Sequence, residues 1–143
     1  MGIEAFVWIY EDGEPASLPF ADVIGAFGDA VREWNPEVGR LRVNYGSEID
    51  SCDIFCGKDV MQAGRVKSLV FDRPPGNPEF WEAVLKIMSL GHALLFFADE
   101  TSPRFHDTAS AAHFPKDLIA SLGTPLTVCT PQDILAGRQL RHK

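Results

Sequence analysis

The chain has 143 residues, of which 45% are hydrophobic and 23% charged, a composition that fits one globular domain and excludes collagen-like and disordered proteins. It contains no apolar run of about 20 residues, and its first residues lack the basic flank and apolar core of a signal peptide, so we expect a cytoplasmic protein without a membrane span. The net charge of −7 argues against nucleic acid or an anionic membrane as the partner.

The first part of the chain predicts a strand followed by a helix. Residues 3–10 are rich in β-branched and aromatic side chains and are apolar on both faces, which predicts a central strand. A turn at residues 11–15 leads into a helix over residues 18–34, which the Asn35-Pro36 pair ends. Five apolar residues recur on one face of this helix: Phe20, Val23, Ile24, Phe27 and Val31.

The middle of the chain predicts an antiparallel meander. Residues 41–45 and 52–56 alternate in polarity, and residues 66–71 form a third short extended run. The connections among these runs are too short for crossover helices, so the three strands should be antiparallel. Asn77 then provides an N-cap, with Pro78 at the first position of a second helix that runs to about Leu90.

The last part of the chain predicts a buried strand, an irregular segment and shorter elements. Residues 93–97 are continuously apolar and follow a glycine, which indicates a strand that is buried on both faces and parallel to a neighbour. Residues 98–113 have no regular pattern. We expect a short helix at residues 115–122, a strand at 126–129 and a final helix opened by Thr130-Pro131.

These elements predict the overall organisation of the protein. We expect an α/β or α+β fold, with a mixed sheet of about six strands that combines the antiparallel meander with parallel strands and is flanked by helices. Residues 1–137 should form a single domain, and residues 138–143 a basic, frayed tail.

Cysteine spacing and glycine motifs predict neither a metal nor a cofactor. Cys52 and Cys56 are four residues apart, but no second Cys or His pair lies nearby, so we expect buried thiols instead of a zinc site. With Cys129 the count is odd, which is typical of reduced cytoplasmic proteins. Gly57-Lys58 lacks the other residues of a phosphate-binding loop, and no dinucleotide-binding glycine pattern follows a strand.

The negative charge is concentrated at one end of the chain. Residues 1–37 hold eight acids and one base and so carry −7, whereas residues 38–143 are neutral. Such a surface would attract a basic partner and accelerate its association, although it could also serve only as a solvated face. We expect Asp22, Asp29 and Glu33 to share one stripe of the first helix. The candidate partner-binding residues are Glu11, Asp12, Glu14, Asp22, Asp29 and Glu33.

The segment 98–113 is the alternative site, because it follows a buried strand where open α/β sheets often place ligands. Asp99 or Glu100 could act as a general base, with His106 or His113 as its partner, in a small enzyme. A ligand-binding domain could use the same cleft. The segment is also compatible with a solvated connection between elements.

Three segments in the last third of the chain resemble known proteins: Ala93–Glu100, Ala111–Leu118 and Leu122–Pro125. They resemble segments of small bacterial proteins, some of which are similar to immunity proteins encoded beside toxins of contact-dependent or type VI secretion systems. The resemblance covers residues 93–135 and implies a protein that occludes a toxin. Because the contact surfaces of such proteins differ from pair to pair, no functional residue carries over. We therefore expect an interaction module that binds a basic partner, such as a toxin, with a homodimer as an open alternative.

Overall fold

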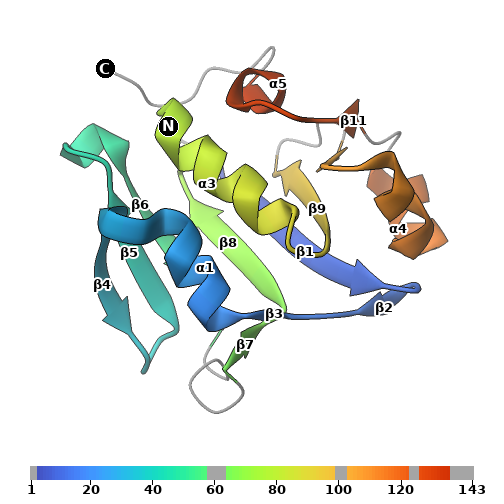
Figure 1. Ribbon diagram of the computed structural model, residues 1–143, viewed down its shortest axis with the longest axis horizontal. Coiled ribbons are helices and arrows are strands. Elements are labelled where there is room, and N and C mark those ends of the chain that lie inside the picture. Colours follow the sequence, from blue (N-terminus) through green and yellow to red (C-terminus); the bar gives the residue numbers. More distant parts are fainter. Residues whose placement is uncertain (1–2, 58–63, 99–102, 123–125, 136–143) are drawn as a thin grey trace.

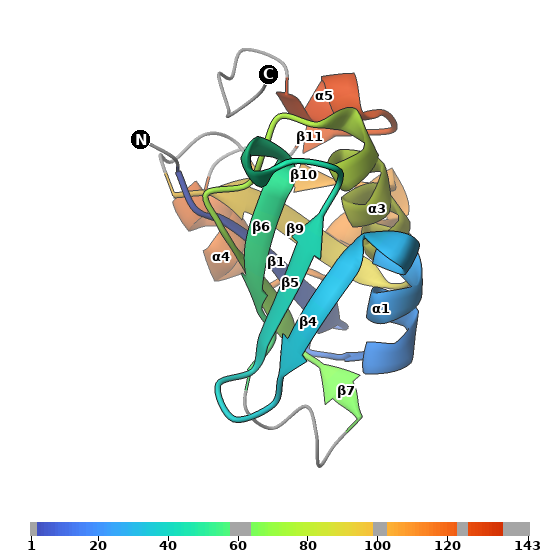
Figure 2. The same cartoon turned by 90° about the vertical axis from the view of Figure 1, so that its left-hand side faces the viewer.

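A computed structural model describes residues 3–57, 64–98, 103–122 and 126–135 and shows one mixed α/β domain (Figures 1 and 2). Its sheet has nine strands, counted over the described residues, instead of the predicted six or so, because β2 (Glu14–Pro15), β4 (Val31–Asn35) and β10 (Arg104–Phe105) form in segments predicted as a turn, a helix and an irregular segment. Strand β1 (Ala5–Glu11) lies at the centre of this sheet, and β2 pairs with its end. Without β2, the eight remaining strands, β1 included, lie in the spatial order β11 (Leu126–Thr127), β10, β9 (His92–Phe97), β1, β8 (Ser68–Asp72), β6 (Ser51–Phe55), β5 (Arg40–Asn44) and β4.

The strand directions confirm part of the predicted sheet. The predicted central strand and the antiparallel meander β5–β6–β8 are both present. Strand β9 is buried as predicted, but the prediction that it is parallel to a neighbour was wrong, because it is antiparallel to both β1 and β10. The helix between β8 and β9 does connect two strands of the same direction, but β1 lies between them. In the described sheet only β10 and β11 form a parallel pair.

Two helices, α1 (Phe20–Phe27) and α3 (Pro78–Met88), lie side by side on one face of the sheet (Figure 1). The predicted helix over residues 18–34 was wrong in its second half. Gly28 has φ +56°, which ends α1, and the chain continues through the 3-10 turn η1 (Gly28–Ala30) into strand β4. The pair β3 (Leu18–Pro19) and β7 (Arg65–Val66) forms a small second sheet before α1.

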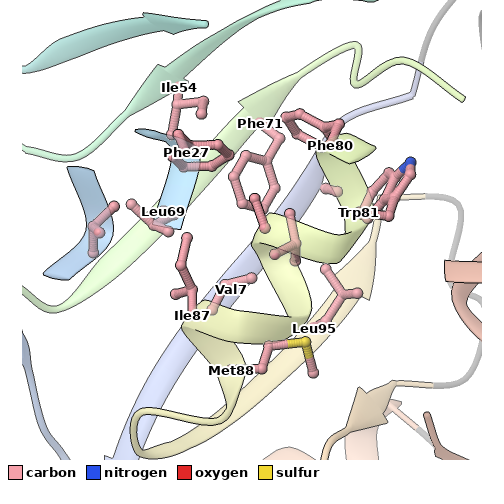
Figure 3. Close-up of a cluster of buried hydrophobic side chains, with 14 of the residues drawn as sticks. Val7, Phe27, Ile54, Leu69, Phe71, Phe80, Trp81, Ile87, Met88 and Leu95 are labelled. Carbon is pink, nitrogen blue, oxygen red and sulfur yellow. The ribbon is translucent and has the colours of Figure 1, made fainter. Parts of the chain in front are cut away.

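The main core lies between the helices and the sheet (Figure 3). Helix α3 buries Phe80, Trp81 and Ile87 against sheet residues such as Phe71 and Leu95. Burial of this apolar stripe explains why the helix forms here, because tertiary packing supplies most of the stability of a short helix.

Among the described residues, the elements that cover the opposite face of the sheet are η3 (Thr108–His113) and α4 (Lys116–Leu122), which lie at one end of it. These elements pack on Leu94 of β9 and Tyr10 of β1. The predicted short helix at 115–122 and the final helix, α5 (Pro131–Leu135), are both present. The predicted tail at 138–143 lies outside the described residues, and within them no helix is long and apolar enough to cross a membrane.

The N-cap of α3 is the clearest local signal in the chain, and it gives a testable result. The Asn77 side chain accepts hydrogen bonds from the backbone N–H groups of Glu79 (2.8 Å) and Phe80 (3.3 Å). Asn77→Ala should lower the free energy of unfolding by about 1 kcal/mol, because two amides lose their acceptor. Asn77→Asp should retain most of the free energy of unfolding that the cap contributes, because its carboxylate accepts the same hydrogen bonds. Urea unfolding measures both, and an unchanged midpoint for Asn77→Ala would contradict the role of this cap.

Candidate partner-binding surface

The structure divides the six predicted acidic residues between different parts of the molecule. Glu11, Asp12 and Glu14 lie in the turn between β1 and β2, whereas Asp22 and Asp29 lie on α1 and η1. In Figure 1 the turn projects at the opposite end of the view from β4, which holds the sixth residue. The six residues therefore do not form one continuous surface.

The predicted acidic stripe on one helix was wrong, because the helix ends before two of its three members. Asp22 is exposed on α1 and Asp29 is exposed in η1. Glu33 lies in β4, where its carboxylate accepts a hydrogen bond from the Arg40 guanidinium of β5 at 3.0 Å. This pairing reduces the charge that Glu33 offers to a partner.

Helix α3 contributes acidic residues that the sequence analysis missed. Glu79 and Glu82 are exposed on α3, which lies beside α1 on the same face of the sheet (Figure 1). Their positions opposite the apolar stripe of α3 predict exposure, but only the packing of the two helices places them near α1. We call the resulting surface the acidic helical face; it consists of Asp22, Asp29, Glu79 and Glu82. Among the described residues of α1, η1 and α3, Lys86 is the one basic side chain.

A cavity of about 370 Å³ lies in the acidic helical face, between η1, the end of β5 and the first turn of α3. Its lining residues are Phe27, Asp29, Ala30, Arg32, Asn44, Tyr45, Gly46 and Glu79. The carboxylates of Asp29 and Glu79 come from different elements, and two aromatic rings line the same space. With Arg32, the lining carries two carboxylates and one guanidinium, a net charge of −1. Such a cavity suits a cationic side chain, which gains net charge attraction from the carboxylates and a cation–π contact from Tyr45.

Two observations describe the electrostatics of this cavity. Burial, reinforced by the negative charge of Glu79, raises the pKa of Tyr45 well above its ordinary value, so the ring keeps its proton. The guanidinium of Arg32 donates hydrogen bonds to the backbone carbonyl groups of Asp29 and Val31, not to the carboxylates. The described contacts therefore leave both carboxylates of the cavity without an ion pair.

The acidic turn between β1 and β2 is a type I′ hairpin held by a histidine. Asp12 and Gly13 have φ values of +52° and +82°, as this Asp-Gly turn requires. The backbone N–H of Asp12 donates to Nδ1 of His113 at 3.1 Å, and the N–H of Gly13 donates to the His113 carbonyl at 2.9 Å. Glu11 and Glu14 lie directly opposite each other, so their like charges repel across the hairpin.

The alternative site in segment 98–113 is only partly described. Asp99 and Glu100 lie outside the described residues, and His106 is exposed. His113 holds the hairpin turn, and its ring stacks on His92 with the ring centres 3.6 Å apart. No described contact joins it to His106.

His92 and Ser110, which no sequence pattern indicates, also belong to this region. Their Nδ1 and Oγ atoms are 3.0 Å apart, but Ser110 is only 4% exposed, so its hydroxyl is closed to a substrate. The two imidazole rings are parallel within 5°, and a metal binds in the plane of an imidazole ring, so they cannot share one ion. More broadly, no three His, Cys, Asp or Glu side chains of the described residues gather as a metal site requires. What the contacts support is a structural role in fixing the hairpin.

The cysteines show which thiol is open to reagents. Cys52 and Cys56 are buried in and beside β6, as predicted, whereas Cys129 is exposed. Burial raises the pKa of Cys56 to about 12, so its thiolate is rare at pH 8. We expect iodoacetamide at pH 8 to label Cys129 alone in the native protein and all three cysteines in urea. Intact-mass and peptide spectrometry measure this, and rapid native labelling of Cys56 would contradict the described packing.

The acidic helical face is the candidate site that the described residues define best, because it combines unpaired carboxylates with a cavity. Helices and strands hold most of its backbone in place, so the ordering that a partner requires falls mainly on the exposed side chains. Comparison of the chain with protein-family models, with curated proteins and with solved structures found no match.

Proposed function

We propose that this protein is an interaction module of the immunity type, which binds a basic protein partner such as a toxin and occludes it. The observation that carries the proposal is the cavity between Asp29 and Glu79, which joins the ring of Tyr45 with two carboxylates that form no ion pair with a described residue. A protruding arginine or lysine of the partner fits this chemistry. Arginine fits it better, because its guanidinium pairs with carboxylates and also stacks on aromatic rings.

In the proposed mechanism, long-range attraction and direct contact with the partner depend on different residues. The net charge of −7 draws a basic partner toward the protein, and the acidic helical face orients it during the encounter. The carboxylates of Asp29 and Glu79 then pair with the partner's cation, while Asp22 and Glu82 surround the contact. The hairpin acids, Glu11 and its neighbours, act at longer range and make no contact.

In this proposal the protein acts as a monomer, in a compartment where its thiols remain reduced. Edge strand β4 carries exposed charges at Arg32 and Glu33 and a bulge between Val31 and Glu33, features that oppose edge-to-edge pairing with a second copy. The three free cysteines, one of them exposed, support a cytoplasmic location, where thiols remain reduced.

Capture from a lysate of the source cell tests the proposal when it includes a matched variant. The wild-type chain and an Asp29→Lys/Glu82→Lys variant are immobilised at equal density and loaded at about 50 mM salt. We expect the wild type to retain one basic protein in stoichiometric amount, to release it at about 500 mM salt, and the variant to retain little of it. Equal retention by both chains, or retention that salt does not affect, would contradict the proposed surface.

A further inference from the structure

The face of the sheet opposite the helices contains a second cavity, which the proposed function does not use. Its volume is about 380 Å³, within the range of about 300–1,000 Å³ that is common for small-molecule sites. It lies where β1, β2 and β8 meet. The lining residues are Trp8, Ile9, Tyr10, Pro15, Lys67 and Ser68.

Two aromatic rings line this cavity from one strand. Trp8 and Tyr10 are two residues apart on β1, so both point to the same face of the sheet, about 7 Å apart along the strand. That backbone spacing is twice the contact distance of about 3.5 Å, so side chains that stand perpendicular to the sheet leave room for a planar group between them. Other rings hold them in place: Phe96 meets Trp8 edge-on at 4.7 Å, and Phe114 meets Tyr10 at 6.1 Å.

The polar groups of the cavity give it a positive end. Lys67 is exposed, and none of the described residues pairs with its ammonium group. Ser68 is half-buried, and its hydroxyl has no hydrogen-bond partner among the described residues. By contrast, Arg40 and Arg42 in the meander are each paired with a carboxylate, at 3.0 and 2.9 Å. A free cation and a free hydroxyl beside two rings point to an anionic aromatic ligand.

We propose that this cavity binds a small planar aromatic carboxylate, with its ring between Trp8 and Tyr10 and its carboxylate on Lys67 and Ser68. One lysine compensates one negative charge, which favours a monoanion. The net charge of −7 and the acidic turn that follows Tyr10 disfavour a polyphosphate. The site lies on the other face of the sheet from the acidic helical face, so either proposal can fail without the other.

Titration with 2-naphthoate and with the neutral 2-naphthamide, followed by NMR, tests this site. We expect 2-naphthoate to bind with a dissociation constant of about 1 mM and to shift the indole N–H signal of Trp8, assigned with Trp8→Phe. The indole signals of Trp34 and Trp81 should not move, because these residues pack with the core on the helical side. 2-Naphthamide should bind about fivefold more weakly, because it lacks the charge that Lys67 attracts.

Two lysine variants provide the matched control. Lys67→Met keeps the aliphatic stem and removes the charge. It should weaken the binding of 2-naphthoate about fivefold without affecting the binding of 2-naphthamide. Lys86→Met removes an equal charge from the exposed side of α3 and should leave both affinities unchanged. Equal affinity for the two ligands, an unaffected Lys67→Met variant, or no Trp8 shift at several times 1 mM would each overturn the proposal.

Discussion

Replacing Trp81 with alanine should lower the free energy of unfolding by about 4 kcal/mol, the largest effect that we expect from any single side chain. Trp81 is 0% exposed, and its ring packs edge-on to Phe80 at 5.0 Å and beside Phe97 at 5.8 Å. Its indole N–H also donates to the Pro75 carbonyl at 2.7 Å, so alanine leaves both a cavity and an unpaired acceptor. Urea unfolding, followed by circular dichroism, measures this loss.

Trp8 provides a control of the same residue type. It is half-buried on the face of the sheet opposite α1 and α3, and its ring contacts Phe96. Trp8→Ala should therefore cost only about 1–2 kcal/mol, because less apolar surface returns to water and no core hydrogen bond is lost. Equal losses in the two variants would contradict the assignment of the main core to the helical side.

The parts of the fold that the sequence predicted correctly depend on local signals. The two-sided apolar run of β1 indicates a central strand, and Asn77-Pro78 marks the start of α3 through hydrogen bonds within one turn. The meander follows from short connections between alternating strands. In each case the residues that decide the structure are close together in the sequence.

The errors come from ambiguous periodicity and from long-range pairing. Val31 and Trp34 fit the helical pattern of residues 18–34, yet they lie in β4 because Gly28 ends the helix with a positive φ. The ring of Trp34 still packs on Phe20, 4.6 Å between ring centres, so its apolar character signals burial without indicating the element. The direction of β9 was missed because β1, more than 80 residues earlier, lies between it and β8.

The same distinction applies to the candidate site. Charge counting located acidic residues in the first part of the chain, including Asp29, which lines the cavity. It could not show that Arg40 pairs with Glu33, or that α3 brings Glu79 beside Asp29, because both depend on tertiary packing. The aromatic cavity on the other face was missed for a related reason: Trp8 and Tyr10 belong to a strand that is apolar on both faces, and only the tertiary structure shows that η3 and α4 leave a cavity beside them.

Reversing two charges on the acidic helical face should weaken binding of the partner more than any other surface change. Asp29→Lys/Glu82→Lys alters net charge by +4 at exposed positions that no described ion pair uses. Association should slow by about tenfold at low salt, because steering is reversed where the partner docks. Dissociation should accelerate by at least about tenfold, because the partner's cation loses a carboxylate in a desolvated contact. Surface plasmon resonance over a range of salt concentrations resolves the two rates.

The most direct measurement compares this variant with Glu11→Lys/Glu14→Lys, which changes net charge equally but in the hairpin turn. Both variants should first show the wild-type unfolding midpoint in urea. We predict that the hairpin variant slows association by about threefold and leaves dissociation unchanged, whereas Asp29→Lys/Glu82→Lys changes both rates. If the two variants have the same rates, or if the hairpin variant alone dissociates faster, the partner does not bind at the cavity between Asp29 and Glu79.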